Sequence, residues 1–229
     1  MAWRRLIATA RGSVGGIGFA TKGIGLQLDL VPDLPGNIGL SFGPDLRYSS
    51  QRGSGVKDEV VALLPDLKST VELGFGAGIS RKKLFTRADS LSASLGMRWD
   101  VSGHAKGWTA HPSVSYFTAL GSGSGAGLSL GATWLDQKYT DYYYTITPEQ
   151  SAATEGQLPT YQAKKGWKDL TASAYYGFDF DNNFKNGGFG MAFSLGYERL
   201  INSAAETPVT SLRGNRNQFT AVAGIGYIF

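Results

Sequence analysis

The sequence predicts an all-β protein, an antiparallel transmembrane β-barrel of about ten strands, within a range of about ten to twelve. Three observations predict this fold. Apolar residues alternate with small or polar ones in many segments. These segments last about 9–11 residues, the length that a tilted membrane strand needs. No apolar run approaches the ~18 residues of a transmembrane helix.

Period-2 alternation is typical of half-buried strands. In chain order, strands are expected at 24–31, 38–48, 70–80, 90–101, 108–117, 125–135, 168–180, 187–199 and 218–229. At least one more is expected within 3–20, where the alternation is poor. An even total of about ten strands is expected, because bacterial single-chain barrels have even numbers. We expect residues 1–229 to form a single barrel domain.

A soluble β-sandwich also alternates and is the alternative fold. Two features favour the membrane barrel over it. The polar face consists of Gly, Ser, Thr and isolated charges, which suits the inside of a closed barrel better than a solvated face. Trp and Tyr also gather near strand ends, as in the aromatic girdles of outer-membrane barrels. These residues are Trp99, Trp108, Trp134, Tyr139, Trp167, Tyr197 and Tyr227.

The connections between the expected strands sort by length. The three long ones, 49–67, 136–166 and 202–215, fall on the same side as 102–107, whereas 31–37, 81–88, 120–124 and 181–186 fall on the other. Outer-membrane barrels have long external loops and short periplasmic turns, so the long connections are expected outside. Within the longest, Thr147 before Pro148 and Gln150 predicts a capped helix start, with a local turn as the alternative.

Composition excludes several classes of function. The chain carries a net charge of +4 but does not cluster it as a nucleic-acid-binding protein would, so no nucleic-acid partner is expected. The absence of cysteine excludes disulfides, thiolate metal sites and cysteine nucleophiles. With only two histidines, neither a metal nor another cofactor is expected.

Charged residues on the inward parity are candidate lumen groups. They are Asp29, Asp45, Arg47, Glu72, Arg98, Asp100, Asp179 and Glu198. They could form a selectivity ring or an acid–base site; the alternative is a salt-bridge network that fills a narrow barrel, because buried charges must be paired.

His111 shares the inward parity with Ser113 and Ser115, which raises a serine-hydrolase hypothesis. Residues two apart on a strand are separated by about 6.6–6.8 Å at the backbone, beyond easy hydrogen-bond reach. We therefore expect no enzyme activity and assign no catalytic residue.

Two basic surfaces are candidate contacts. Arg81, Lys82, Lys83 and Arg87 form a turn expected on the periplasmic side, which could dock an acidic partner or simply be solvated. Basic residues on the expected outer side could pair with lipopolysaccharide phosphates and outer-membrane lipid. They are Lys164, Lys165, Arg213 and Arg216.

The last residues alternate with a terminal aromatic, as expected of a signal read by the barrel-assembly machinery. Phe229, Tyr227 and Ile225 share the lipid-facing parity. An ordinary amphipathic strand at the end of the chain is the alternative.

Several motifs resemble the MipA/OmpV family of outer-membrane proteins, also called MltA-interacting proteins. They are Tyr142–Tyr144, Pro148–Ala153, Leu158–Tyr161, Gly166, Glu198–Ile201, Glu206–Val209 and Gln218–Phe229, with Leu28–Pro32, Phe42–Pro44, Leu46–Tyr48 and Val71–Gly74 further upstream. The resemblance covers nearly the whole chain. Family precursors have a signal peptide and more chain before residue 4, so the family's N-terminal start is expected to be missing here.

The resemblance implies a non-enzymatic scaffold in the outer membrane of a Gram-negative bacterium. Such a protein brings a lytic transglycosylase and a penicillin-binding protein together at the murein layer. A narrow passive channel is the alternative function.

Overall fold

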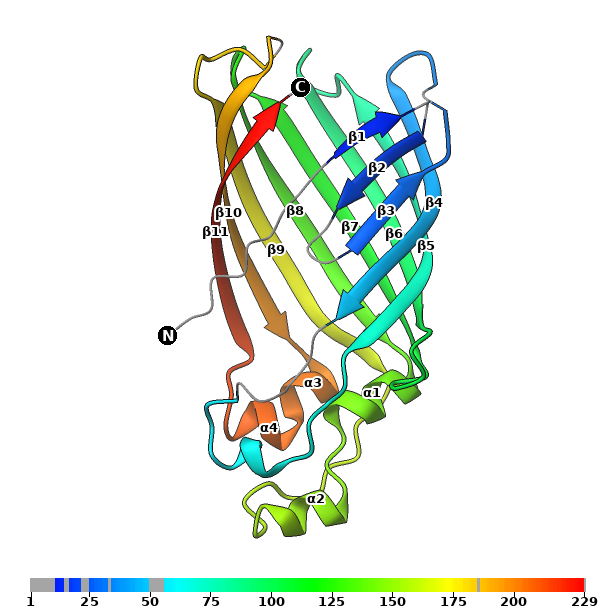
Figure 1. Ribbon diagram of the computed structural model, residues 1–229, viewed down its shortest axis with the longest axis vertical. Coiled ribbons are helices and arrows are strands. Elements are labelled where there is room, and N and C mark those ends of the chain that lie inside the picture. Colours follow the sequence, from blue (N-terminus) through cyan, green and yellow to red (C-terminus); the bar gives the residue numbers. More distant parts are fainter. Residues whose placement is uncertain are drawn as a thin grey trace.

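The strands form one antiparallel sheet in which every strand pairs with its neighbours in the sequence (Figure 1). The structure, a computed structural model, describes residues 11–14, 17–21, 25–32, 34–49, 56–184 and 186–228. The eleven strands are β1 (Arg11–Val14), β2 (Ile17–Thr21), β3 (Gly25–Asp29), β4 (Ile38–Ser49), β5 (Thr70–Lys82), β6 (Asp89–Asp100), β7 (Trp108–Ala119), β8 (Ser124–Leu135), β9 (Gly166–Asp179), β10 (Gly188–Leu200) and β11 (Asn217–Ile228). The predicted all-β antiparallel fold is confirmed.

The first part of the chain differs in detail from the prediction. Two short strands, β1 and β2, stand where at least one was expected, and Val14 pairs with Ile17 across a two-residue connection. The described strands therefore number eleven, within the predicted range although not even.

The sheet curls around an internal space, here called the lumen. Gln27 on β3 and Glu198 on β10 line the same cavity, together with residues from all the strands between them. Only a strongly curved sheet brings strands so distant in sheet order around one space (Figure 1).

The two faces of the sheet are inverted relative to a water-soluble protein. Large apolar side chains such as Leu128, Leu195 and Phe219 are exposed on the outer face, whereas Glu72, Thr109 and Asp169 are buried inside. Soluble monomers do not expose a continuous apolar surface of this kind. The exposed belt is what a bilayer would cover, and the alternation that predicted the strands has this physical cause.

The long connections gather at one end of the sheet, here called the loop end, as their predicted sorting required (Figure 1). They carry η1 (Val61–Leu63), α1 (Gln137–Tyr144), α2 (Pro148–Ala153), α3 (Asn202–Glu206) and α4 (Pro208–Ser211). Most of the buried apolar residues lie in small clusters here, one of them formed by Val60, Val61, Leu64, Ile146 and Leu158. No helix in the described ranges is long and apolar enough to cross a bilayer.

The predicted helix start in the longest connection is confirmed. Thr147 caps α2 by accepting a hydrogen bond from the Gln150 backbone at 3.3 Å, and the Gln150 side chain accepts one from the Thr147 backbone at 3.0 Å. This reciprocal pair satisfies two backbone donors that the helix itself leaves free.

Candidate functional site

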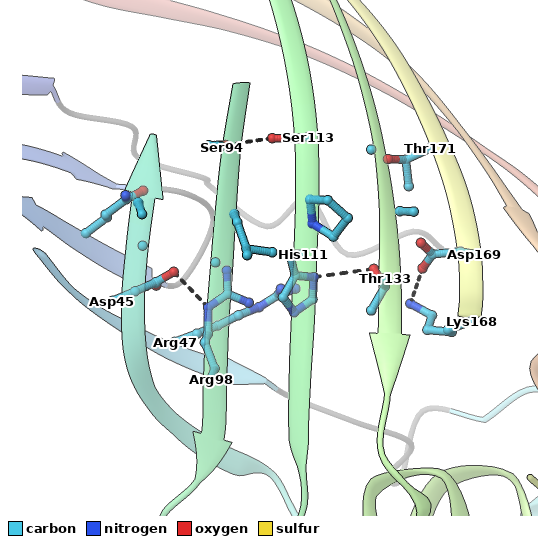
Figure 2. A pocket seen from close by; sticks show the side chains of 18 of the residues that line it. Asp45, Arg47, Ser94, Arg98, His111, Ser113, Thr133, Lys168, Asp169 and Thr171 are labelled. Atoms are coloured by element: carbon cyan, nitrogen blue, oxygen red, sulfur yellow. Dashed lines mark hydrogen bonds and ion pairs between the residues drawn. The ribbon is translucent and has the colours of Figure 1, made fainter. Parts of the chain in front are cut away.

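Inward-pointing charges form two separate clusters in the lumen. In the first, Arg98 on β6 donates through Nε to Asp45 on β4 at 2.9 Å, and both side chains are almost fully buried. Gly96, two residues before Arg98, borders the pair, and a Cβ there would be in ordinary contact with the Asp45 carboxylate at 3.5 Å. Arg47 also lines the cavity on this side (Figure 2).

The second cluster joins β9 to β10. The Lys168 ammonium lies 2.7 Å from the Asp169 carboxylate and 3.0 Å from that of Glu198. Asp169 is 1% exposed, so its carboxylate is shielded from water and its charge is balanced by the lysine instead.

A β-bulge turns Lys168 toward the inside. Thr133 of β8 pairs with Asp169, but Trp134 pairs with Trp167, which leaves Lys168 as the extra residue. A bulge re-aims the side chain of its extra residue, so Lys168 and Asp169 both reach the lumen although they are adjacent in the chain. The sequence analysis missed both residues. Asp169 has the inward parity and could have been found, whereas strict alternation places Lys168 outside.

His111 lies between the two clusters (Figure 2). Its Nε2 is 2.9 Å from the Thr109 hydroxyl and its Nδ1 is 3.4 Å from the Thr133 hydroxyl. The Ser113 and Ser115 hydroxyls instead pair with Ser94 and Ser129, both at 2.8 Å. The geometry therefore gives no support to a serine nucleophile activated by His111.

Three other carboxylates that were predicted to face the lumen accept hydrogen bonds from backbone N–H groups at strand ends. Asp29 accepts hydrogen bonds from Val31 and Phe42. Asp100 accepts from the backbone of the loop 102–106, and Asp179 from that of the turn 181–183. These carboxylates fix connections, and the cavity between the two charge clusters does not include them.

Glu72 fastens α1 over the loop end. This carboxylate is 2% exposed and accepts a 2.7 Å hydrogen bond from the Tyr139 hydroxyl. Tyr139 was expected in the aromatic girdle, but it lies on α1 and points into the lumen mouth. The same helix binds the Lys68 backbone through Tyr142 and packs Tyr144 against the cluster formed by Leu200, Ala204 and Ala205. The helix thus reaches from the β5 side to the cluster where β10 ends and α3 begins.

The first turn of α1 packs closely against the backbone of Gly107. Asp136 caps the helix at the Tyr139 backbone (2.9 Å) and also accepts from the Trp108 backbone (3.1 Å). A Cβ on Gly107 would come within 2.5 Å of the Tyr139 nitrogen, so only glycine fits. We call α1, α3, α4 and the segment 56–69 the cap.

Burial in the cap changes the ionisation of its tyrosines, which lie beyond the strand ends. Burial, with a smaller contribution from the Glu72 charge, raises the pKa of Tyr139, and burial raises that of Tyr143 from 10.0 to about 12. Between pH 10 and about 12 the unfolded chain therefore releases protons that the folded cap retains.

We expect the cap to lose stability as the pH rises through this window. Absorbance titration should show tyrosines that ionise only above the normal pKa, together with loss of near-ultraviolet circular dichroism. The stability of the cap should depend less on pH in the Tyr143→Phe variant, because this variant lacks one of the titrating hydroxyls. Ionisation of every tyrosine near pH 10 without any cap transition would contradict the prediction.

The predicted basic turn lies at the opposite end of the sheet, here called the turn end. Arg81, Lys82, Lys83 and Arg87 are all exposed. One aromatic residue, Phe85, stands among them with 78% of its surface exposed and its ring 6.0 Å from that of Tyr116. The sequence analysis did not single out Phe85.

A buried carboxylate holds this basic turn in one shape. Asp89 accepts hydrogen bonds from the backbone of Leu84 (2.7 Å), Phe85 (2.9 Å) and Thr86 (3.0 Å). It also accepts one from the Tyr116 hydroxyl at 3.0 Å. The basic and aromatic side chains are thus displayed on a pre-organised backbone, which lowers the entropic cost of binding a partner.

The remaining predicted residues lie on the surface. Tyr227 and Ile225 are exposed on β11, with the Tyr227 ring against Phe189 at 5.0 Å, and Phe229 lies outside the described residues. At the loop end, Lys164, Lys165, Arg213 and Arg216 are exposed, and Arg213 lies 3.4 Å from Asp58.

Comparison with known proteins identifies the family. No curated protein and no solved structure matches the chain. The family model described as "MltA-interacting protein MipA" matches residues 9–229. This is a family of outer-membrane proteins, in agreement with the apolar outer face and polar lumen of the sheet. Because the match covers nearly all of the sequence, the chain belongs to the MipA family.

Proposed function

We propose that the protein is a non-enzymatic scaffold in the outer membrane of a Gram-negative bacterium. It binds a lytic transglycosylase, the partner class to which the family description refers, and a penicillin-binding protein. The observation that carries this proposal is the rigid basic turn with Phe85 at its centre.

The orientation follows from the two unequal ends. Long loops face outward and short turns face the periplasm in outer-membrane barrels. The loop end with its cap then lies outside, and the basic turn faces the murein layer. In this orientation Tyr227 and Ile225 lie near the end of the last strand on the periplasmic side, where the barrel-assembly machinery would read them. Lys164, Lys165, Arg213 and Arg216 lie at the outer leaflet, near lipopolysaccharide phosphates.

The basic turn has the chemistry of a protein-binding surface. Exposed aromatic residues are enriched among the residues that dominate binding energy, and surrounding cations steer an acidic partner. Exposed Phe85 is not explained by the bilayer alone, since the turn also presents Lys82, Lys83 and Arg87. An acidic surface with an apolar pocket is the complementary partner surface.

The cap favours the scaffold over the channel. On α1, Tyr139 binds Glu72 of β5, and Tyr144 packs against the cluster of Leu200, Ala204 and Ala205 on the other side of the loop end. A helix across this mouth obstructs the passage that a porin needs, whereas a scaffold needs only a rigid frame.

Affinity capture tests the proposal. The refolded protein in detergent is exposed to envelope extract, and retained murein enzymes are identified. Wild type should retain a lytic transglycosylase, and the Phe85→Ala variant should retain it about tenfold less, as expected when an aromatic anchor is removed. The triple variant Arg81→Ala/Lys82→Ala/Lys83→Ala should also retain less enzyme than wild type. Its deficit should be larger at low salt than at high salt, because salt screens the charges that it lacks.

The matched control removes positive charge at the loop end. Lys164→Ala/Lys165→Ala should retain the enzyme as well as wild type does. If neither wild type nor the control retains a murein enzyme at low salt, the scaffold proposal is wrong. Equal retention by the turn variants would place the contact elsewhere.

A further inference from the structure

The lumen contains a cavity whose two sides differ in charge. Its volume is about 310 Å³, near the lower end of ligand pockets in proteins. The first charge cluster, from β4 and β6, forms one wall. The second, from β9 and β10, forms the facing wall, with His111 and Thr133 between them (Figure 2).

The walls carry opposite net charge. On the first wall, the two cations Arg47 and Arg98 stand against one anion, Asp45, which gives +1. On the second wall, one cation stands against two anions, which gives −1. Its residues are Lys168, Asp169 and Glu198. The cavity as a whole is neutral but strongly dipolar.

Each wall also has one unused hydrogen-bonding atom. Within the described part of the chain, Nη1 of Arg98 and Oδ1 of Asp169 are buried without a hydrogen-bond partner. Such groups are costly to leave unsatisfied, so both favour a ligand that reorders the side chains and supplies the missing partner. Arg98 needs an acceptor such as a carboxylate, and Asp169 needs a donor such as an ammonium.

The spacing of the walls sets the length of that ligand. Three strand spacings of about 4.8 Å separate β6 from β9, roughly 14 Å measured along the curved sheet, and both the curvature of the sheet and the inward reach of the Arg98 side chain shorten this gap. A single amino acid holds its ammonium and carboxylate within about 3 Å of each other. An extended chain of three residues spans about 10 Å, which matches the gap better.

We propose that this lumen cavity binds a short linear zwitterion, an unblocked peptide of about three residues. Its carboxylate lies at Arg47 and Arg98, and its ammonium lies at Asp169 and Glu198. His111 and Thr133 face the middle of the peptide, where hydroxyl and imidazole groups can bond to its amides. Because the cap covers the loop end, the peptide enters from the turn end.

Isothermal titration of the refolded full chain in detergent tests this site with triglycine. Triglycine should bind, N-acetyltriglycine and triglycinamide should each bind about tenfold more weakly, and glycine should be weaker still. Each blocked peptide lacks one of the two charges, so the two losses report on the two walls separately.

Two variants test which end of the peptide binds to which wall. Both leave the buried Arg98–Asp45 pair intact. Arg47 is exposed, and the Glu198 side chain is about one third exposed, so Arg47→Gln and Glu198→Gln should both fold. Arg47→Gln should prefer triglycine over triglycinamide less than wild type does, because only Arg98 remains to meet the carboxylate. Glu198→Gln should prefer triglycine over N-acetyltriglycine less than wild type does, because only Asp169 remains to meet the ammonium. This pattern of lost sensitivity is the signature of direct coupling.

Ser115→Ala is the matched control, because this lumen side chain pairs with Ser129 and does not line the cavity. It should bind triglycine as wild type does. The proposal is overturned if wild type does not bind triglycine at millimolar concentration, or if the blocked peptides bind equally well. Loss of binding in Ser115→Ala equal to that in the wall variants would also overturn it. None of these outcomes bears on capture of murein enzymes, so the scaffold is judged separately.

Discussion

Excision of residues 137–165, with a short Gly/Ser linker in their place, is expected to make the barrel conduct ions. The excised segment includes α1, which carries the Tyr139 contact to Glu72 and the packing of Tyr144 against the cluster of Leu200, Ala204 and Ala205. Without it, the loop end loses the helix that ties β5 to β10, and the polar lumen becomes continuous with solvent at that mouth. Planar-bilayer recordings should show stepwise current in the variant and none in wild type.

A smaller excision in the same connection is the control. Replacing 149–153 by the same linker removes most of α2, a helix with no buried residue, and leaves α1 and the buried Thr154 in place. This variant should remain closed. Conduction by wild type would favour the channel function over the scaffold. A closed barrel after full excision would show that side chains within the lumen or the remaining parts of the cap, rather than α1, block the passage.

The largest loss of stability is expected from Lys168→Met. Lys168 neutralises two carboxylates, and Asp169 beside it is almost completely buried. Removing one partner of a buried ion pair costs about 3–5 kcal/mol, because the remaining charge is stranded away from water. The lower part of this range is expected, since Glu198 is partly exposed and water can reach it. Denaturant unfolding in detergent measures the free energy of unfolding.

Neutralising the stranded carboxylates should restore much of this loss. The triple variant Lys168→Met/Asp169→Asn/Glu198→Gln leaves no unpaired charge in the cluster, so it should be more stable than Lys168→Met alone. The comparison variant Lys165→Met removes an exposed lysine three residues earlier and should change the free energy of unfolding by less than about 0.5 kcal/mol. Equal stability of Lys168→Met and wild type would mean that water already solvates the cluster.

The sequence was sufficient to predict most strands because a single physical rule applies to them. Lipid on one face and a polar lumen on the other impose a period of two, and strands β4 to β11 follow it closely. The rule is weak in the first part of the chain, where β1 and β2 have only four and five residues. It also fails at Lys168, because a bulge changes the facing of one residue without changing the composition of the strand.

The candidate site was predictable in part. The four basic residues of the turn could be read from their clustering. The order imposed on that turn depends on Asp89 and Tyr116, which pair across neighbouring strands and are distant in the sequence. The same holds for Tyr139, because its position on a helix over the lumen depends on Glu72, 67 residues earlier. Alternation describes each strand by itself, whereas these contacts require the completed sheet.

The long sequence separation of the Glu72–Tyr139 contact also has a consequence for the order of assembly. Each hairpin of the sheet joins strands that follow one another, so its ends meet after a short loop closes. The contact between α1 and β5 requires β6, β7 and β8 to be in place first, and the packing of Tyr144 against the cluster of Leu200, Ala204 and Ala205 requires β9, β10 and α3 as well. During biogenesis, we therefore expect the mouth at the loop end to stay open while the strands pair in sequence. Water is expected to leave this mouth only when α1 packs over it, after the last of these strands has formed.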